Sequence, residues 1–504
     1  MSDQTSVFGR LRSFFWPVYR NELKVFVPML LIFFFISFNY SILRTAKDAL
    51  VITAKDSGVE AIPFLKTWAI LPMAILLTFL FTRLSNKYKI EKVFYLMMGI
   101  FLGYFLLFVF VIYPFHEFLH PHAFADTLEE ILPRGLHGLV AIIRNWTFTT
   151  FYVMAELWGS AIMSVCFWGF ANAVTSVSAA KRFYALLALA GNTSSMVSGH
   201  AATSISNWGH SLVSWTNKPA WENSLILLAT TVLVCGLIAI WLLRWLSTRG
   251  VNGSTSAFTF DKTDSDIKMG VRKNFSYLLK SKYLLCIALI VVTYNIAMNL
   301  TEVVWKDQLH QLCPNPNDYQ AYMGQVIMWI GVISMVMALF SGALIRAFGW
   351  TFGAIIPPMI LLVTGIGFFS LIFFKDIGMA QMLFLVGSSP LVSVVFIGAL
   401  QHCLCRASKY TFFDNTKELA FIPLNQESKL KGKAAIDGIG SRFGKSGGAL
   451  IYQFLLLFFG TISMTIPFVA LALFLVVIVW IFAVRSLGKQ FDPLMASPEQ
   501  PTLK

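Results

Sequence analysis

The stretch RGVNGSTSAFTFDKTDSD, residues 249–266, is a polar break in a chain that is otherwise strongly apolar. It belongs to the longest internal polar segment, residues 247–280. Apolar runs lie on both sides of it, and it divides them into two equal sets. We therefore expect two six-helix halves, residues 25–246 and 281–485, joined by a cytoplasmic linker over 247–280.

The composition places these runs in a membrane. Of the 504 residues, 57% are hydrophobic and only 13% are charged, whereas soluble domains carry about 25% charged residues. A run of about 20 apolar residues suffices to cross the hydrocarbon layer. The sequence predicts an all-α polytopic membrane protein with twelve transmembrane helices at about 25–47, 62–83, 92–114, 145–170, 184–206, 223–246, 281–305, 321–346, 350–374, 379–405, 434–460 and 464–485.

The basic residues give the orientation of these helices. Most of the 39 Lys and Arg fall in the N-terminus, in alternate loops and in the C-terminus, and such residues favour the cytoplasmic side. Residues 1–24 and the tail 486–504 are therefore expected in the cytoplasm. The net charge of +14 then reflects topology, and no nucleic-acid partner is expected.

Two features concern the ends of the chain and its cysteines. FGRLRSFFWPVYR, residues 8–20, is typical of an amphipathic segment on the lipid bilayer, and Asp3 and Glu22 argue against a cleaved signal. Of six cysteines only Cys313 falls in an external loop, so no disulfide framework is expected.

Weak internal repeats support the two halves. FNYSILRT at 38–45 aligns with YNIAMNLT at 294–301, and GNTSSMVSG at 191–199 aligns with GSRFGKSGG at 440–448. The two offsets are close to each other. Parallel six-helix repeats with a site near the midplane characterise the major facilitator fold, and SGALIRAFGW at 341–350 resembles a loop motif of that superfamily.

Four ionisable residues lie inside the predicted spans: Lys47, Glu156, Glu302 and Lys445. Each costs about 2.5 to 3.5 kcal/mol at a helix centre, so they are not expected to face lipid. Polar residues at helical spacing accompany each of them. These companions are Tyr40 and Arg44; Thr149, Tyr152 and Ser160; Asn295 and Asn299; and Asp437, Ser441 and Arg442. The four helices would border a central aqueous site.

Structural alternatives remain open for these charges. Arg44, Lys47 and Asp48 could mark the outer end of the first helix and extend to the interface. Lys445 could lie at a cytoplasmic helix end. Glu156 and Glu302 could form internal ion pairs with lysines, which does not exclude a role in gating.

The segment GIGSRFGKSGG, residues 438–448, imitates a phosphate-binding loop. That motif requires glycine five residues before Gly444, and the sequence has Ile439 there. We interpret the segment as the start of a membrane helix whose small residues allow close approach of a neighbour, with Lys445 turned to a water-filled cavity.

The predicted site favours an anionic substrate. Arg44, Lys47, Arg442 and Lys445 outnumber Glu156 and Glu302, and charge-assisted hydrogen bonds would hold phosphates. Tyr40 and Tyr152 could stack on a flat ring, although packing is the commoner role of such residues.

The block KYTFFDNTKELAFIPLNQESKLKGKAAIDGIGSRFGKSGG, residues 409–448, resembles the signature region of the ATP/ADP translocases of obligate intracellular bacteria and plastids. ELWGSAIMSVCFWGFAN at 156–172 and AAKRFYALLALAGN at 179–192 resemble two further blocks of that family. The resemblance implies a transporter that takes up host ATP in exchange for ADP, with no enzymatic activity and no cofactor. Lys47, Glu156, Glu302 and Lys445 resemble residues that members of the family need for transport.

The resemblance also implies a bacterial inner-membrane location, and we expect a monomer. Other members of the family import several nucleotides with protons or exchange NAD, so these activities remain alternatives. Whether phosphate is also transported stays open. No function is assigned to the external insert at 115–144.

A metal-binding pattern and a different transported anion are two alternatives to the nucleotide site. His116, Glu117 and His120 form an HExxH pattern, which in metallopeptidases binds zinc on a rigid helix. Pro114 and Pro121 enclose it and leave barely one helical turn, so we expect neither peptidase activity nor a metal site. Transport of another anion, such as a sugar phosphate, remains open on physical grounds.

Overall fold

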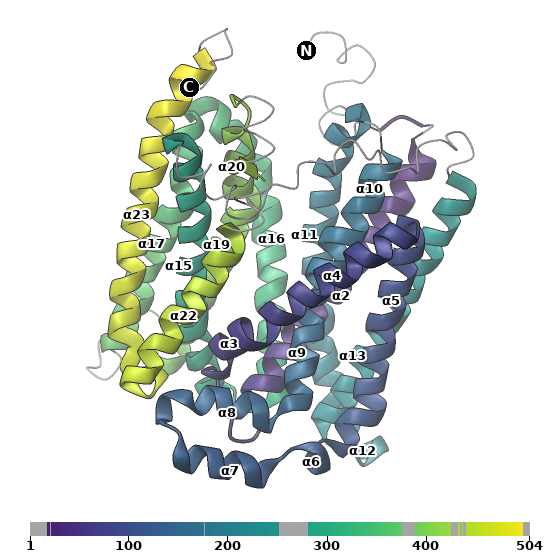
Figure 1. Cartoon of the computed structure of the whole chain (residues 1–504), viewed down its shortest axis with the longest axis vertical. Coiled ribbons are helices and arrows are strands. Elements are labelled where there is room, and N and C mark those ends of the chain that lie inside the picture. The colour runs from purple at the N-terminus through teal and green to yellow at the C-terminus, as the bar shows by residue number, and fades with distance from the viewer. Residues whose placement is uncertain are drawn as a thin grey trace.

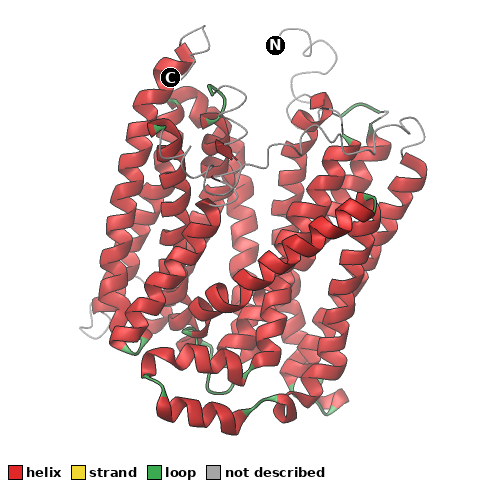
Figure 2. Ribbon diagram, in the orientation of Figure 1, coloured by secondary structure: helices red, strands yellow, loops and turns green. Residues whose placement is uncertain are grey.

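The computed structural model describes residues 18–20, 22–175, 177–250, 281–374, 389–424, 432, 433, 436 and 440–496. These residues form helices and connecting loops, and the described part contains no strand (Figure 2). Most of the predicted N-terminal amphipathic segment, most of the linker and the end of the tail lie outside them.

The first set of membrane helices begins with α2 (Leu23–Ile52) and ends before residue 251. Several of its spans consist of an α-helix that continues into a π-helical stretch without a loop. The remaining elements are α3 (Ala61–Phe64), η1 (Leu65–Ile70) and α4 (Leu71–Lys87); α5 (Ile90–Leu107) and η2 (Phe108–Ile112); α9 (Trp146–Trp158), η5 (Gly159–Phe167) and α10 (Trp168–Val174); α11 (Val177–Ser211); α12 (Val213–Thr216); α13 (Ala220–Trp245) and η6 (Leu246–Gly250).

The second set follows residue 280. It comprises α15 (Lys282–Leu312), α16 (Pro316–Phe348), α17 (Trp350–Phe374), α19 (Pro390–Ser408), η9 (Lys409–Phe413), α20 (Asp414–Ala420), α22 (Ser441–Phe459) and α23 (Ile462–Ala496). Figure 1 shows the two sets as two groups of helices, with the described termini, at the start of α2 and the end of α23, at the same end of the molecule.

Within the described residues, ten helical segments are long and apolar enough to cross a membrane. The helices α11 and α22 are not among the ten: α11 is rich in polar and small residues, and the apolar part of α22 is the shorter segment Phe443–Phe459. An all-α polytopic protein is therefore confirmed, whereas the number twelve stays a prediction.

Local sequence explains several helix ends. Ser281, Asn315 and Ser389 cap α15, α16 and α19 by accepting a backbone N–H, and proline follows directly at the start of α16 and α19. Gly349 and Gly460 end α16 and α22 with φ of 88° and 77°. Glycine adopts this conformation without a Cβ clash, which permits the tight turns before α17 and α23.

Glycines also bring the two sets into direct contact through α11 and α16. A Cβ on Gly199 would lie 2.4 Å from the carbonyl oxygen of Gly324, and one on Gly331 would lie 2.7 Å from the backbone nitrogen of Met196. Only residues without side chains permit such an approach. The pair α11 and α16 is thus a close backbone contact between the two sets.

The predicted external insert folds into short helices at the end of the molecule opposite the termini (Figure 1). Its elements are η3 (Tyr113–Phe115), α6 (His116–Leu119), α7 (His122–Ile131), η4 (Arg134–Leu136) and α8 (His137–Arg144). Arg144 is buried and pairs with Asp56, Asp126 and Glu129 at 3.5, 2.6 and 3.0 Å. This arginine fixes α7 and α8 to the loop that follows α2.

Candidate functional site

Charged side chains of α2, α9 and α15 meet between the two sets of helices. Lys47 and Asp48 lie in the last part of α2, Glu156 lies in α9, and Glu302 and Lys306 lie one turn apart in α15. Since α2 and α15 both start near the end that carries the termini, these residues lie toward the opposite end. Three of the four intramembrane charges singled out from the sequence, Lys47, Glu156 and Glu302, thus belong to one region.

The charges form a continuous chain of ion pairs. Lys47 Nζ lies 3.3 Å from a Glu156 oxygen and 3.2 Å from an Asp48 oxygen. The other Asp48 oxygen lies 2.8 Å from Lys306 Nζ, which is also 2.8 Å from Glu302 Oε1. The chain therefore links the first set of helices to the second.

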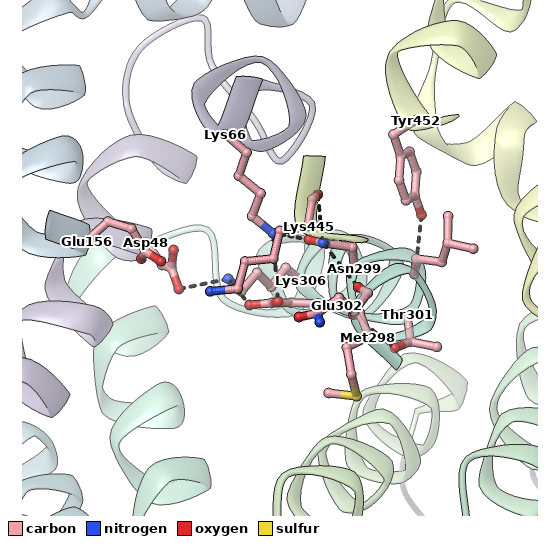
Figure 3. A network of polar contacts seen from close by, with 12 residues as sticks. Asp48, Lys66, Glu156, Met298, Asn299, Thr301, Glu302, Lys306, Lys445 and Tyr452 are labelled. Atoms are coloured by element: carbon pink, nitrogen blue, oxygen red, sulfur yellow. Dashed lines mark hydrogen bonds and ion pairs between the residues drawn. The ribbon is translucent and has the colours of Figure 1, made fainter. Parts of the chain in front are cut away.

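Glu302 is the centre of the network and attracts three cations. Lys306 holds Oε1, whereas Lys66 from η1 and Arg406 from α19 both approach Oε2, at 3.9 and 3.5 Å. Lys66 also donates a hydrogen bond to the Asn299 side chain. Figure 3 shows Lys66 reaching toward Asn299 and Glu302, with Lys306 directed toward Asp48.

Burial divides the network into two parts. The side chains of Lys47, Asp48 and Lys306 are at most 4% exposed, while those of Lys66, Arg406 and Glu156 are 21%, 20% and 32% exposed. A buried charge is tolerated only when it is paired. The buried part thus joins the helices, and the other part is partly open to solvent.

Asn295 and Asn299 pack against α22. A Cβ on Gly444 would lie 2.7 Å from Asn295 Cβ, and one on Gly448 would lie 2.7 Å from Asn299 Cβ. Asn299 also donates to the backbone oxygen of Lys445, at 3.0 Å. The prediction that small residues of 438–448 admit a neighbouring helix is confirmed for Gly444 and Gly448.

Lys445 itself has an exposed side chain, within electrostatic range of Glu156, Lys409 and Arg406. Its ammonium makes no ion pair with any described residue. Arg44 is half-buried and likewise has no hydrogen bond or ion pair within the described part of the chain. The Arg442 side chain and Asp437 lie outside the described residues.

The two tyrosines proposed for stacking differ in their surroundings. Tyr152 is 1% exposed, and Lys47 Nζ lies 3.6 Å from its ring centroid. In this conformation the Lys47 ammonium therefore covers a face of the Tyr152 ring, and that face is not free to stack on a nucleotide base. Tyr40 is half-buried and lies against Gly159, where a Cβ would come within 2.8 Å of the ring.

Lys66, Lys306 and Arg406 were not predicted from the sequence as site residues, and Asp48 was expected only as a helix-end residue. Lys306 and Arg406 each directly follow a predicted span, 281–305 and 379–405. The structure continues both helices, to Leu312 and through Ser408 to Ala420. A polar stripe extended one turn further, from Asn299 and Glu302 to Lys306, would have found the lysine.

The HExxH segment is engaged in structural contacts. His116 Nδ1 bonds to the Tyr113 carbonyl oxygen, and His120 Nε2 lies 2.7 Å from the Thr147 hydroxyl. The intervening helix α6 has four residues. Among the described residues, no group of three His, Cys, Asp or Glu side chains is arranged to hold a metal ion.

Two relatives match nearly the whole chain. The chain is 46% identical to ADP,ATP carrier protein 1 of Chlamydia trachomatis serovar D over 498 residues, which cover 98% of this chain and 93% of that protein. It is 43% identical to ADP,ATP carrier protein 1, chloroplastic, of Arabidopsis thaliana over 477 residues, which cover 95% and 75%.

Solved structures of low sequence identity share the fold. A D-xylose-proton symporter matches with a TM-score of 0.54 and 12% identity, covering 93% of this chain and 97% of that one. A bacterial homologue of the iron transporter ferroportin matches with a TM-score of 0.51 and 14% identity, covering 95% and 99%. The fold is therefore of the major facilitator type, as expected.

A family model described as "TLC ATP/ADP transporter" matches residues 1–491. Together with relatives above 40% identity over nearly the whole chain, this match establishes that the chain belongs to the TLC ATP/ADP transporter family.

Proposed function

We propose that this protein is a nucleotide antiporter that takes up ATP in exchange for ADP by alternating access. One observation supports the proposal in addition to family membership: the region around the network between the helix sets exposes more cations than carboxylates. Lys66, Arg406, Lys445 and Arg44 are at least partly accessible, whereas Glu302 is buried and Glu156 is the partly accessible carboxylate of the network. Such a surface suits a polyphosphate.

The network also gives a physical reason for exchange. Without nucleotide, the cations share too few carboxylates, and unpaired charge in a low dielectric is costly. A bound nucleotide supplies the missing negative charge, so rearrangement is easier for the loaded protein than for the empty one. In this proposal Lys445 and Arg442 hold phosphates from the second set of helices, and Arg44 assists from the first. Lys47, expected from the sequence to assist as well, is buried in this conformation and paired with Asp48 and Glu156.

We further propose that residues 25–246 and 281–485 move as two bodies about the site. Contacts between them gather toward the end opposite the termini, where Gln453 of α22 donates to the Pro63 oxygen and the Thr67 hydroxyl, both at 2.9 Å. With both termini in the cytoplasm, as the basic residues indicate, this conformation is closed to the outside. We assign the protein to a bacterial inner membrane as a monomer.

Proton-coupled import of several nucleotides, or NAD exchange, would use the same fold, and neither the network nor the names of the relatives favours it. The proposal is tested by expressing the protein in bacterial cells that take up no nucleotides. Internal ADP should accelerate entry of labelled ATP, and an uncoupler should leave that acceleration in place. An uptake rate that does not change with internal ADP and that the uncoupler abolishes would contradict exchange.

A further inference from the structure

Glu302 Oε2 is held loosely in comparison with the rest of the network. Charge-assisted N–H···O bonds are typically about 2.7 to 2.9 Å long. Lys306 meets that length at Oε1, but Lys66 and Arg406 remain at 3.9 and 3.5 Å from Oε2. Two cations thus converge on one oxygen without either making a short bond to it.

Arg406 has donor capacity to spare. The only hydrogen bond of its side chain among the described residues is the one from Nη2 to Glu302, and its Nε is buried without a partner. An orphaned buried donor is costly, and a guanidinium presents donors in a fork that fits two oxygens of a phosphate. The side chain is 20% exposed, so a ligand can reach it.

Lys66 and Arg406 come from different sets of helices, η1 and α19. A group bound to both would bridge the two bodies next to the buried Asp48 and Lys306 pair. Its anionic oxygen would compete with Glu302 Oε2 for Lys66 and Arg406. Glu302 would then keep only its ion pair with Lys306.

We propose that Lys66 and Arg406 form the subsite for the terminal phosphate of the transported nucleotide, where a phosphate oxygen replaces Glu302 Oε2. This inference rests on the proposed function and assigns a position to one part of its substrate. The subsite makes affinity depend on the number of phosphates, because a nucleotide bound elsewhere in the site reaches Lys66 and Arg406 only when its phosphate chain is long enough.

The test uses the full-length protein and competition of unlabelled ATP, ADP and AMP against binding of labelled ATP. In Lys66→Gln and Arg406→Gln, the inhibition constant for ATP should rise roughly 10- to 100-fold, as expected for loss of a charge-assisted bond, while that for AMP stays within about twofold. Arg406→Lys should recover part of the affinity, because it keeps the charge but not the fork. Lys92→Gln, at an exposed lysine of α5, serves as the matched control.

A structural role would weaken binding of ATP, ADP and AMP equally, and unchanged inhibition constants would mean that neither side chain binds the phosphate. Either result would overturn the subsite. Should both variants fail to fold, Glu302→Gln decides, since it removes the competing charge: ATP should bind more tightly, and weaker binding would overturn the proposal. The wild-type protein is assayed for ADP-stimulated uptake in parallel. Failure there contradicts exchange, while the competition series still reports on the subsite.

Discussion

Lys306 Nζ lies 2.8 Å from Asp48 Oδ2, although 258 residues separate the two in the chain. Both side chains are at most 2% exposed. The pair is therefore a buried ionic contact between the two sets of helices, at the level where α2 and α15 approach the end opposite the termini. In an alternating-access cycle, this contact has to break whenever that end opens.

Lys306→Gln should weaken closure of that end. The buried Asp48 would keep only Lys47 as a partner, and breaking a buried pair typically costs about 3 to 5 kcal/mol. We expect a lower thermal midpoint and a several-fold faster leak of internal labelled ATP into nucleotide-free buffer.

The matched control is Lys218→Gln, which removes an exposed pair with Glu222 and should change little. A stable Lys306→Gln protein with an unchanged leak would show that the Asp48 contact does not hold that end closed.

Gly444→Ala should destabilise the contact between α15 and α22. Its Cβ would lie 2.7 Å from Asn295 Cβ and 2.9 Å from the Val292 oxygen, and such overpacking costs about 1 to 3 kcal/mol. Gly447→Ala, three residues away, meets nothing closer than 3.8 Å. The thermal midpoint of Gly444→Ala should therefore be lower than that of Gly447→Ala. Equal midpoints would refute the assigned packing.

Gly135→Ala should lift the external insert from the second set of helices. Its Cβ would come within 2.3 Å of the Leu456 carbonyl oxygen. Because this oxygen belongs to the backbone of α22, it cannot move aside as the end of a flexible side chain could. We expect faster proteolysis at the neighbouring Arg134 in intact cells. Gly103→Ala has nothing within 4 Å and should match the wild type; an equal rate in Gly135→Ala would mean that the insert does not rest on α22.

The contact of the insert with Glu60 should depend on pH. His137 lies 3.2 Å from Glu60 and 3.4 Å from Glu129, with Arg144 nearby. The hydrogen bond to Glu60 raises the pKa of His137 above its ordinary 6.5. The same bond lowers the pKa of Glu60 against the opposing effect of burial.

The stabilisation from His137 is complete below its ordinary pKa and is lost as pH rises through the raised value. The part from Glu60 is present above its ordinary 4.5 and is lost as pH falls through the lowered value. Between about pH 6 and pH 8, the thermal midpoint of the wild type should therefore fall more than that of His137→Gln. Parallel curves would contradict this account.

Sequence reasoning found the core of the network but not its full extent. It identified Lys47, Glu156 and Glu302 because a charge inside an apolar run is costly. It also raised the pairing of these glutamates with lysines, which the structure shows for Glu156 with Lys47 and for Glu302 with Lys306 and Lys66.

It missed Lys306 and Arg406 for a physical reason. A span predicted from hydropathy ends at the first charged residue, whereas the helix itself continues until its backbone is capped or broken. Both residues therefore look like loop cations in the sequence and lie inside helices in the structure. The position of Lys66 beside Asn299 depends on packing between the two sets of helices, which no local pattern encodes.

The central claim is that negative charge from a nucleotide allows the network to rearrange. Its most direct test is entry of labelled ATP into proteoliposomes of the purified protein that contain ADP, AMP or no nucleotide. The account predicts rapid, sustained entry with internal ADP and only slow entry in the other two cases. Equal rates in all three would contradict it.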